Sequence, residues 1–411
     1  MHKTTALPST EINPAVNEHA AQWGLSPTSG PMWDFNTATF QTMLAQFNAS
    51  PPHEKVQKLA EFLQTVMKIS KPYGQFEHTL PPEFIDLFNE TFPVKLAQGT
   101  EKSEAHPVTV KKIQIDSKTL PQAGTEAYAA QALPKSPYWI LPETLWLAPH
   151  APQSFNPARS STAPPPHPVY TLYAAMPVAL GVELCHLVMP GEASPEKQLF
   201  LDQLGSKGEG LSLTEIPHIS RIKIVLNLFK ALQELHTKHE WIHHDLKSNN
   251  LFLTEDLRVI LMGFGMSHDQ TDCISASVSK GSVNYAATEL FLERPVTDPT
   301  LTPSIDAFSA GVVAQEILTA HIILEFTLFG PAKLAHIRWE DLSKSNPTQN
   351  GYAVENAALI VDGLKQSGFT PEQTSVLTEI ITGLHHPLPE HRMTLETAIA
   401  QLTPLTDAAG T

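Results

Sequence analysis

A short polar stretch, HHDLKSNN at residues 243–250, constrains this chain more than any other segment. The apolar residues of the preceding segment, 220–239, recur every three or four positions, which predicts a long buried helix. These positions are Ile222, Val225, Leu228, Leu232 and Leu235. The apolar run LFL at 251–253 follows the stretch directly. Because unpaired charges between two buried elements cost free energy, the stretch indicates a functional loop and not a chance charge pair on a solvated turn.

The groups in this loop suit phosphoryl transfer. That reaction needs a carboxylate that orients the attacking hydroxyl, a cation near the moving phosphate and ligands for the metal that balances the nucleotide's charge. Asp245, Lys247 and Asn250 supply one group of each kind within a few positions of one another.

The loop resembles the catalytic loop of eukaryotic-type protein kinases, H-R-D-L-K-x-x-N, with His244 in place of the arginine. The matching residues are His243, Asp245, Leu246, Lys247 and Asn250. The resemblance implies that Asp245 and Lys247 are the catalytic residues, one as the base-like group and one as the contact to the transferred phosphate. It also implies that Asn250 binds the metal and the cofactor. A lysine two places after the aspartate is the form seen in serine/threonine kinases.

Further segments resemble the same family in the same order, so that the resemblance covers roughly residues 92–404. VTVKKIQI at 108–115 resembles the strand that carries the nucleotide-binding lysine, which would be Lys111. The implied fold is α+β and bilobal, with a strand-rich N-lobe and a helical C-lobe.

The C-terminal part of the chain supplies three more matches, which are GSVNYAATELF, SIDAFSAGVV with Asp306, and HRMT with Arg392. GSVNYAATELF at 281–291 resembles the end of an activation segment, with Thr288 in place of a proline. The resemblance implies that Asp306 fixes the backbone of the catalytic loop and that Arg392 pairs with Glu289. All three charged residues are expected to be structural.

One departure affects the metal site. MGFG aligns with the D-F-G motif, so that Gly263 replaces the aspartate that holds magnesium in the family. Glycine offers no side-chain ligand. Asp256 and Asp269 lie near in sequence, and either would substitute only if the loop folds unusually.

The nucleotide-binding segments are also reduced. The segment LAQGTEKSEA offers Gly99 alone as a cofactor-binding glycine, where the family has a glycine-rich loop. Glu126 is the candidate partner of Lys111, on a helix that we expect to begin at Thr125. A position so close to the helix start leaves open that Glu126 is only a favourable first-turn charge. We therefore expect weak ATP binding, and we leave the need for Mg²⁺ open.

His244 has a regulatory meaning. The family's arginine at this position often pairs with a phosphate on the activation segment, and a largely neutral histidine would do so weakly. A phosphorylation switch in this segment is therefore not expected. The candidate hydroxyl residues are Thr271, Ser275, Ser277 and Ser279.

The organisation expected along the chain includes two strands, at 169–180 and 182–190, followed by a mainly helical region from Ile219. The proline-rich stretch 148–170 is expected to form a loop inside the domain. The expected domains are a disordered tail at 1–35, a helical extension at 36–91, a protein kinase-like domain at 92–404 with its N-lobe at about 92–195 and its C-lobe at about 196–404, and a tail at 405–411.

Composition limits the partners and the compartment. The net charge of −15 disfavours nucleic acid, and no apolar run is long enough for a membrane span. Two cysteines, Cys185 and Cys273, give neither a disulfide framework nor a zinc spacing in sequence. A reducing compartment, the cytoplasm, is expected, or a host cytosol if the chain is a secreted effector.

Two functions remain. The first is a pseudokinase that binds ATP weakly, has impaired phosphotransfer and acts through protein–protein interaction. The alternative is an active protein serine/threonine kinase that transfers the γ-phosphate of ATP with an atypical metal site. Either function implies a protein partner or a protein substrate.

Overall fold

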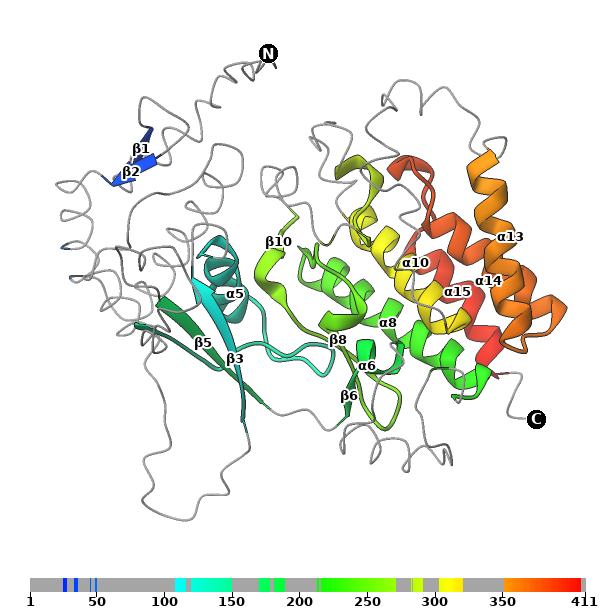
Figure 1. Cartoon of the computed structure of the whole chain (residues 1–411), viewed down its shortest axis with the longest axis horizontal. Coiled ribbons are helices and arrows are strands. Elements are labelled where there is room, and N and C mark those ends of the chain that lie inside the picture. Colours follow the sequence, from blue (N-terminus) through cyan, green and yellow to red (C-terminus); the bar gives the residue numbers. More distant parts are fainter. Residues whose placement is uncertain are drawn as a thin grey trace, which may run out of the picture. The chain divides into compact units, whose positions relative to one another are not determined.

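The structure is a computed structural model in which only part of the chain is described (Figure 1). The described residues are 25–27, 33–35, 108–115, 120–149, 170–177, 181–188, 216–270, 284–290, 303–320 and 351–407, with the single positions 45, 49, 213 and 282. They divide into two compact units, one drawn from 1–96, 112–131 and 144–174 and the other from 97–111, 132–143 and 175–411.

The first unit holds most of a three-stranded sheet. In this sheet β5 (Tyr170–Pro177) lies between β3 (Val108–Ile115) and β4 (Thr144–Pro149). The strands predicted at 108–115 and 169–180 are confirmed. β4 was not predicted, and it takes in the first two residues of the expected proline-rich loop. The remainder of that loop, up to β5, lies outside the described residues.

Helix α5 (Leu120–Ala132) corrects one prediction. We expected a helix that begins at Thr125, but it begins five residues earlier and Thr125 lies inside it, 2% exposed. Pro121 fits the first turn because the amide N–H that proline lacks has no partner within a helix at that point. Glu126 therefore lies at mid-helix, and the first-turn reading of its charge is wrong.

Part of the predicted tail has regular structure. β1 (Leu25–Pro27) pairs antiparallel with β2 (Trp33–Phe35), in the register Leu25↔Phe35. The predicted helical extension at 36–91 lies outside the described residues, apart from the exposed positions 45 and 49.

The second unit begins with β6 (Val182–Glu183) and α6 (Leu184–Val188). A single strand was predicted over 182–190, which is wrong at 184–188, where the chain is helical; 189 and 190 lie outside the described residues. The buried residues of α6 are Leu184, Cys185, Leu187 and Val188, and this spacing belongs to a helix that places one face in the core. The run is apolar and contains β-branched residues, so its composition alone resembles that of a strand.

Five long helices are the main elements among the described residues of the second unit (Figure 1). They are α8 (His218–Lys238), α10 (Pro303–Thr319), α13 (Gly351–Gln366), α14 (Pro371–Leu384) and α15 (Leu395–Asp407). Helix α8 packs on α10 and α15, and α14 packs on α10, α13 and α15. The five apolar positions predicted for α8 are all fully buried, which confirms that prediction. Nearly all of α10 is buried, as expected for a helix surrounded by others.

Short strands carry the loop of interest. β8 (Leu251–Leu253) pairs antiparallel with β6 and with β9 (Val259–Leu261), and β7 (Trp241–Ile242) pairs antiparallel with β10 (His268–Asp269). The 3₁₀ helices of this unit are η2 (Ser248–Asn250), η3 (Phe264–Met266), η4 (Thr288–Leu290) and η6 (Pro389–His391). The described part is thus mixed α and β, which fits the predicted bilobal kinase class.

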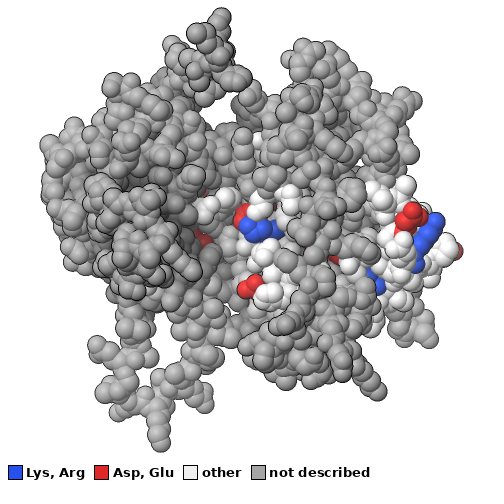
Figure 2. All heavy atoms as spheres, in the orientation of Figure 1, with Lys and Arg blue, Asp and Glu red and all other residues white. Residues whose placement is uncertain are grey.

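Basic and acidic side chains of the described residues lie next to one another in small groups on the face drawn in Figure 2. The ion pairs Lys238–Glu234 (3.0 Å) and Arg258–Asp256 (2.6 Å) also belong to the described residues. No helix among the described residues is long and apolar enough to cross a lipid bilayer.

Candidate active site

The backbone of the loop at 243–250 is hydrogen-bonded to Asp306 of α10. The backbone N–H of His243 donates to Oδ2 of Asp306 (2.7 Å), and that of His244 donates to Oδ1 (2.8 Å). His236 of α8 contacts Oδ2 through Nε2 (2.8 Å). Burial by itself raises the pKa of the fully buried Asp306, but these hydrogen bonds and the neighbouring histidines hold it well below its usual range. Asp306 thus fixes the loop backbone as an anion, as predicted.

His243 belongs to the core and not to a metal site. Its side chain is fully buried and its ring packs against Phe264, with 4.9 Å between ring centroids. Nδ1 accepts from the backbone N–H of Asp245 (3.4 Å), which assigns the ring proton to Nε2. Nε2 then donates to the carbonyl of Met262 (2.8 Å), so His243 ties the loop to the chain that leads into Gly263.

Asp245, Lys247 and Asn250 are brought together by the turn that ends in η2. Nζ of Lys247 lies 2.8 Å from Oδ2 of Asp245. Nδ2 of Asn250 donates to the backbone carbonyl of Asp245 (2.6 Å) and to Oδ2 (3.0 Å). The structure therefore places the three predicted residues in one hydrogen-bonded group.

Ser282, from the expected activation segment, also contacts this group. Its hydroxyl donates to Oδ1 of Asp245 (2.7 Å) and accepts from Nζ of Lys247 (2.7 Å). Asp245 thus holds a hydroxyl on one oxygen, at the distance from which a general base can accept a proton, and a cation on the other. Sequence reasoning placed Ser282 in the activation segment but missed this contact. The available signal was a hydroxyl residue directly after Gly281.

Gly263 adopts the left-handed conformation, with φ 78° and ψ 49°. A Cβ at this position would lie 2.6 Å from Oδ1 and 2.7 Å from Cγ of Asn250, so the amide of Asn250 already fills the space of a side chain. Glycine is therefore favoured here by both its backbone and its surroundings.

Magnesium prefers carboxylate oxygens and phosphates in an octahedral shell. Among the described residues, the group beside Gly263 offers one neutral oxygen, Oδ1 of Asn250. Both oxygens of Asp245 are engaged by Lys247, Ser282 and Asn250. These residues do not fit a magnesium ion held in the way the family resemblance implies.

The two nearby aspartates do not supply the missing ligand in this arrangement. Asp256 lies in the turn between β8 and β9, at the opposite end of the hairpin from Asn250. It is engaged by the Thr254 hydroxyl (2.5 Å), which lowers its pKa, and by Arg258 (2.6 Å). Asp269 belongs to β10 and pairs with Trp241 of β7.

The nucleotide-binding candidates are described only in part. Lys111 lies on β3, whose side chains are outside the described part of the structure. Gly99 lies outside the described residues. Glu126 is 2% exposed at the middle of α5.

His244 lies beside a second buried histidine. Its Nδ1 is 3.3 Å from Nδ1 of His268, and the rings are 5.0 Å apart. The backbone of His244 has φ 64°, an uncommon value for a non-glycine residue. His268 carried no signal in the sequence reading. The four hydroxyl residues of the expected activation segment lie outside the described residues.

The end of the activation segment is tied to the C-terminal helices. Arg392 makes a two-pronged ion pair with Glu289, with contacts of 2.8 and 2.9 Å, and both side chains are almost fully buried. Tyr285 donates to Glu316 of α10 (2.9 Å) and contacts the hydroxyl of Ser248 (3.2 Å). The predicted structural roles of Glu289 and Arg392 are confirmed by this pairing.

Comparison with known proteins agrees with this geometry. The family described as protein kinase domain matches residues 192–402. The serine/threonine/tyrosine-protein kinase HT1 of Arabidopsis thaliana is 33% identical over 114 residues, which is 28% of this chain and 27% of that protein. The serine/threonine-protein kinase fray1 of Dictyostelium discoideum is 31% identical over 105 residues, 25% of this chain and 17% of that protein.

A longer match is to the LysM domain receptor-like kinase 10 of Oryza sativa subsp. japonica. It is 26% identical over 193 residues, 46% of this chain and 30% of that protein. The chain thus spans less than a third of the length of each of these relatives. The match to the family covers more than half of the chain and includes the group around Asp245. The chain therefore belongs to the protein kinase family.

Proposed function

We propose that this chain is a pseudokinase, which binds ATP weakly, transfers phosphate slowly or not at all, and acts through a protein partner. The observation that carries the proposal is Gly263. It stands where the family holds a metal-binding aspartate, and the amide of Asn250 occupies the space that a side chain would need. Loss of this ligand should lower turnover by several orders of magnitude, because the dication neutralises the charge that develops on the phosphates.

Nucleotide binding has support that does not depend on Gly263. Lys111 on β3 is the candidate contact to the phosphates, with Glu126 as the candidate partner that orients it. The amide oxygen of Asn250 faces Gly263. Gly99 is the one glycine of the expected phosphate loop. Fewer glycines mean fewer backbone N–H groups close to the phosphates, so the affinity should be weak.

A second candidate function is an active serine/threonine kinase with an atypical metal site. The contact between Asp245 and the Ser282 hydroxyl favours it, because this carboxylate is already placed to accept a proton from a hydroxyl. Lys247 lies beside the same hydroxyl and would offset negative charge on a transferred phosphate. This function requires a dication that is held without a carboxylate at position 263.

A thermal-shift titration with ATP tests the nucleotide step. The full chain and a Lys111→Ala variant are each titrated with ATP in the presence of magnesium and then of EDTA. The pseudokinase proposal expects a small rise in melting temperature that survives EDTA and is lost in the variant. Stabilisation that depends on magnesium would favour the active kinase. The absence of any shift would overturn ATP binding and leave a scaffold.

Transfer of the γ-phosphate to a generic protein substrate tests the chemistry directly. We expect incorporation no higher than that of an Asp245→Asn variant, which keeps the shape of the side chain but removes its charge. Incorporation that the variant abolishes would contradict the pseudokinase proposal, because it would show that Asp245 serves as a base.

The partner surface and the location are further parts of the proposal. The proposed domains are a helical extension at 36–91 and a kinase-like domain at 92–404, and the extension is one candidate surface for the partner. The expected compartment is a cytosol, that of the cell itself or of a host. Co-purification of the full chain and of a chain that begins at residue 92 with the same bait would test whether the extension carries the contact.

A further inference from the structure

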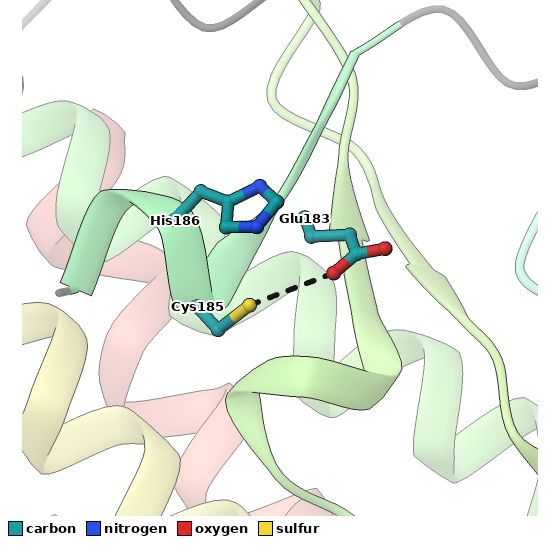
Figure 3. A group of neighbouring side chains, drawn as sticks. All are labelled: Glu183, Cys185 and His186. Atoms are coloured by element: carbon teal, nitrogen blue, oxygen red, sulfur yellow. Dashed lines mark hydrogen bonds between the residues drawn. The ribbon is translucent and has the colours of Figure 1, made fainter. Parts of the chain in front are cut away.

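Three potential metal ligands converge at the junction of β6 and α6. They are the carboxylate of Glu183, the thiol of Cys185 and the imidazole of His186, and their ligand atoms all lie within 4.8 Å of one another. Figure 3 shows the three side chains turned toward a common space, with Cys185 and Glu183 joined by a hydrogen bond. None of these three residues belongs to the hydrogen-bonded group around Asp245.

The distance between the Cys185 sulfur and the Glu183 carboxylate fits a tetrahedral ion such as Zn²⁺. Zn²⁺ binds sulfur at about 2.3 Å and carboxylate oxygen at about 2.0–2.2 Å, so that a tetrahedral angle places the two ligand atoms about 3.6 Å apart. Sγ of Cys185 lies 3.6 Å from Oε2 of Glu183. This one pair thus has the spacing that zinc imposes, and the His186 ligand atom lies within 4.8 Å of both.

The apolar residues around the ligands are packed in the core. Val182, Leu184, Leu187 and Val188 are all 4% exposed or less, and they surround the three ligands in sequence. Gly181 adopts φ 151°, and a Cβ there would lie 2.1 Å from the carbonyl oxygen of Leu253. This close approach of Gly181 to β8 fixes the start of β6, so ion binding would require little ordering of the main chain.

The ligand types favour zinc over magnesium or calcium. Thiolate and imidazole suit borderline-soft ions, whereas magnesium and calcium select shells of oxygen atoms. Without an ion, the thiol of Cys185 donates its hydrogen to Oε2 of Glu183.

We propose that Glu183, Cys185 and His186 bind one Zn²⁺ ion, with water in the fourth position. On binding, the S–H bond of Cys185 breaks, a Zn–S bond forms and the proton leaves to solvent. Glu183 exchanges its hydrogen bond for a Zn–O bond, and neutral His186 contributes a ring nitrogen. His186 is exposed and Glu183 is half-buried, so the ion can enter from solvent. Helix α6 packs on η2, which carries Asn250, so the site adjoins the catalytic loop.

The test uses the full chain with Cys273→Ser as the background, because Cys185 is then its only thiol. After treatment with EDTA and its removal by dialysis, the protein is titrated with Co²⁺ as a coloured substitute for zinc. We expect a sulfur-to-cobalt charge-transfer absorption that saturates at one equivalent and disappears when Zn²⁺ is added. Absence of this absorption would overturn the proposal.

Two variants assign the ligands by zinc titration calorimetry. Cys185→Ser and His186→Gln should each weaken zinc binding by more than about 100-fold, since the loss of even an outer-shell partner costs about 10–100-fold. His391→Gln, which removes an exposed histidine elsewhere, should bind zinc as the background does. Unchanged zinc affinity in both ligand variants would overturn the site. Circular dichroism checks their folding, and the exposed His186 gives a variant that leaves the core untouched.

Discussion

At the scale of single residues, position 263 is where this chain departs from the metal-binding D-F-G motif of its family. Gly263 has no side chain to bind a metal, and a side chain there would be strained at φ 78° and would have to displace the amide of Asn250. Gly263→Asp should therefore not restore magnesium-dependent stabilisation by ATP. It should lower the melting temperature, because a side chain in this backbone conformation costs on the order of 1 kcal/mol and displaces Asn250.

Thermal-shift titrations of this variant with ATP and magnesium check the prediction. Gly263→Ala serves as the control, since it adds the Cβ without the carboxylate and should be destabilised to a similar degree. The prediction is contradicted if Gly263→Asp melts like the parent and gains magnesium-dependent stabilisation by ATP. That result would show that Asn250 moves easily and that this single substitution restores the metal site.

A second residue gives the fold a pH dependence. Burial lowers the pKa of the fully buried His385 to about 3, while unfolding returns it to its usual value of 6.5. Between these two values the unfolded state binds the extra proton, so stability falls as pH falls below about 6.5. At pH 5 the loss from this residue alone is on the order of 2 kcal/mol.

Urea denaturation between pH 7.5 and 5 measures this effect. His385→Gln, which cannot be protonated, should flatten the dependence of the unfolding free energy on pH. His391→Gln removes an exposed histidine that packs on His386 and helps to lower the pKa of His386, so it should change the slope much less than His385→Gln does. Equal slopes in the parent and the His385 variant would show that other groups cause the acid sensitivity.

At the scale of elements, helix α14 shows how one turn contributes to stability. The hydroxyl of Thr370 accepts from the backbone N–H of Gln373 (3.2 Å), and the Gln373 side chain accepts from the backbone N–H of Thr370 (3.0 Å). This reciprocal cap satisfies two donors that the helix itself leaves unpaired. Thr370→Ala should reduce the unfolding free energy by about 1 kcal/mol.

Chemical denaturation of the full chain provides the measurement. Thr370→Ser keeps the hydroxyl and should retain most of the stability. A Thr370→Ser variant as unstable as Thr370→Ala would show that the threonine methyl group, and not the cap, is responsible.

Elements with a strong period were predictable from sequence, and those fixed by distant contacts were not. Helix α8 followed from its repeating apolar positions, and all five proved fully buried. The start of α5 was missed because Gly124 and Pro121 look like breaks, although proline is tolerated in a first turn. The residues of α6 resemble a strand in composition, and only their packing shows the helical period.

The candidate site divides in the same way. The local group of Asp245, Lys247 and Asn250 is close in sequence, so its motif was sufficient to place it. Ser282 comes from a segment more than 30 positions away and reaches Asp245 only through the folded chain. The sequence also could not show that the amide of Asn250 fills the space beside Gly263. That contact depends on both the side-chain conformation of Asn250 and the backbone conformation of Gly263.

At the scale of the whole second unit, buried arginines join segments that are distant in sequence. Arg221 of α8 donates to the carbonyls of Leu318 (2.8 Å) and Ser367 (3.0 Å), at the ends of α10 and α13. Burial lowers its pKa to about 10, so it remains charged at neutral pH. Arg392 similarly joins Glu289 to the segment that leads into α15.

The Arg392–Glu289 pair provides the last prediction. Glu289→Gln leaves the arginine charged and buried without its anion, which should cost about 3–5 kcal/mol of unfolding free energy. Arg392→Met should cost a similar amount for the opposite reason. The double variant removes both charges together, so its loss should be clearly smaller than the sum of the two single losses.

Urea denaturation of the four proteins forms a double-mutant cycle, with the exposed pair Lys238–Glu234 as a matched control that should show little coupling. Strong coupling for Arg392–Glu289 would mean that the activation segment is anchored by this pair whether or not phosphate is ever transferred. Additive losses would mean that Arg392 acts mainly through its contacts to the carbonyl of Ser304 (2.7 Å) and to the Phe308 ring, and that the segment is held by α10 instead.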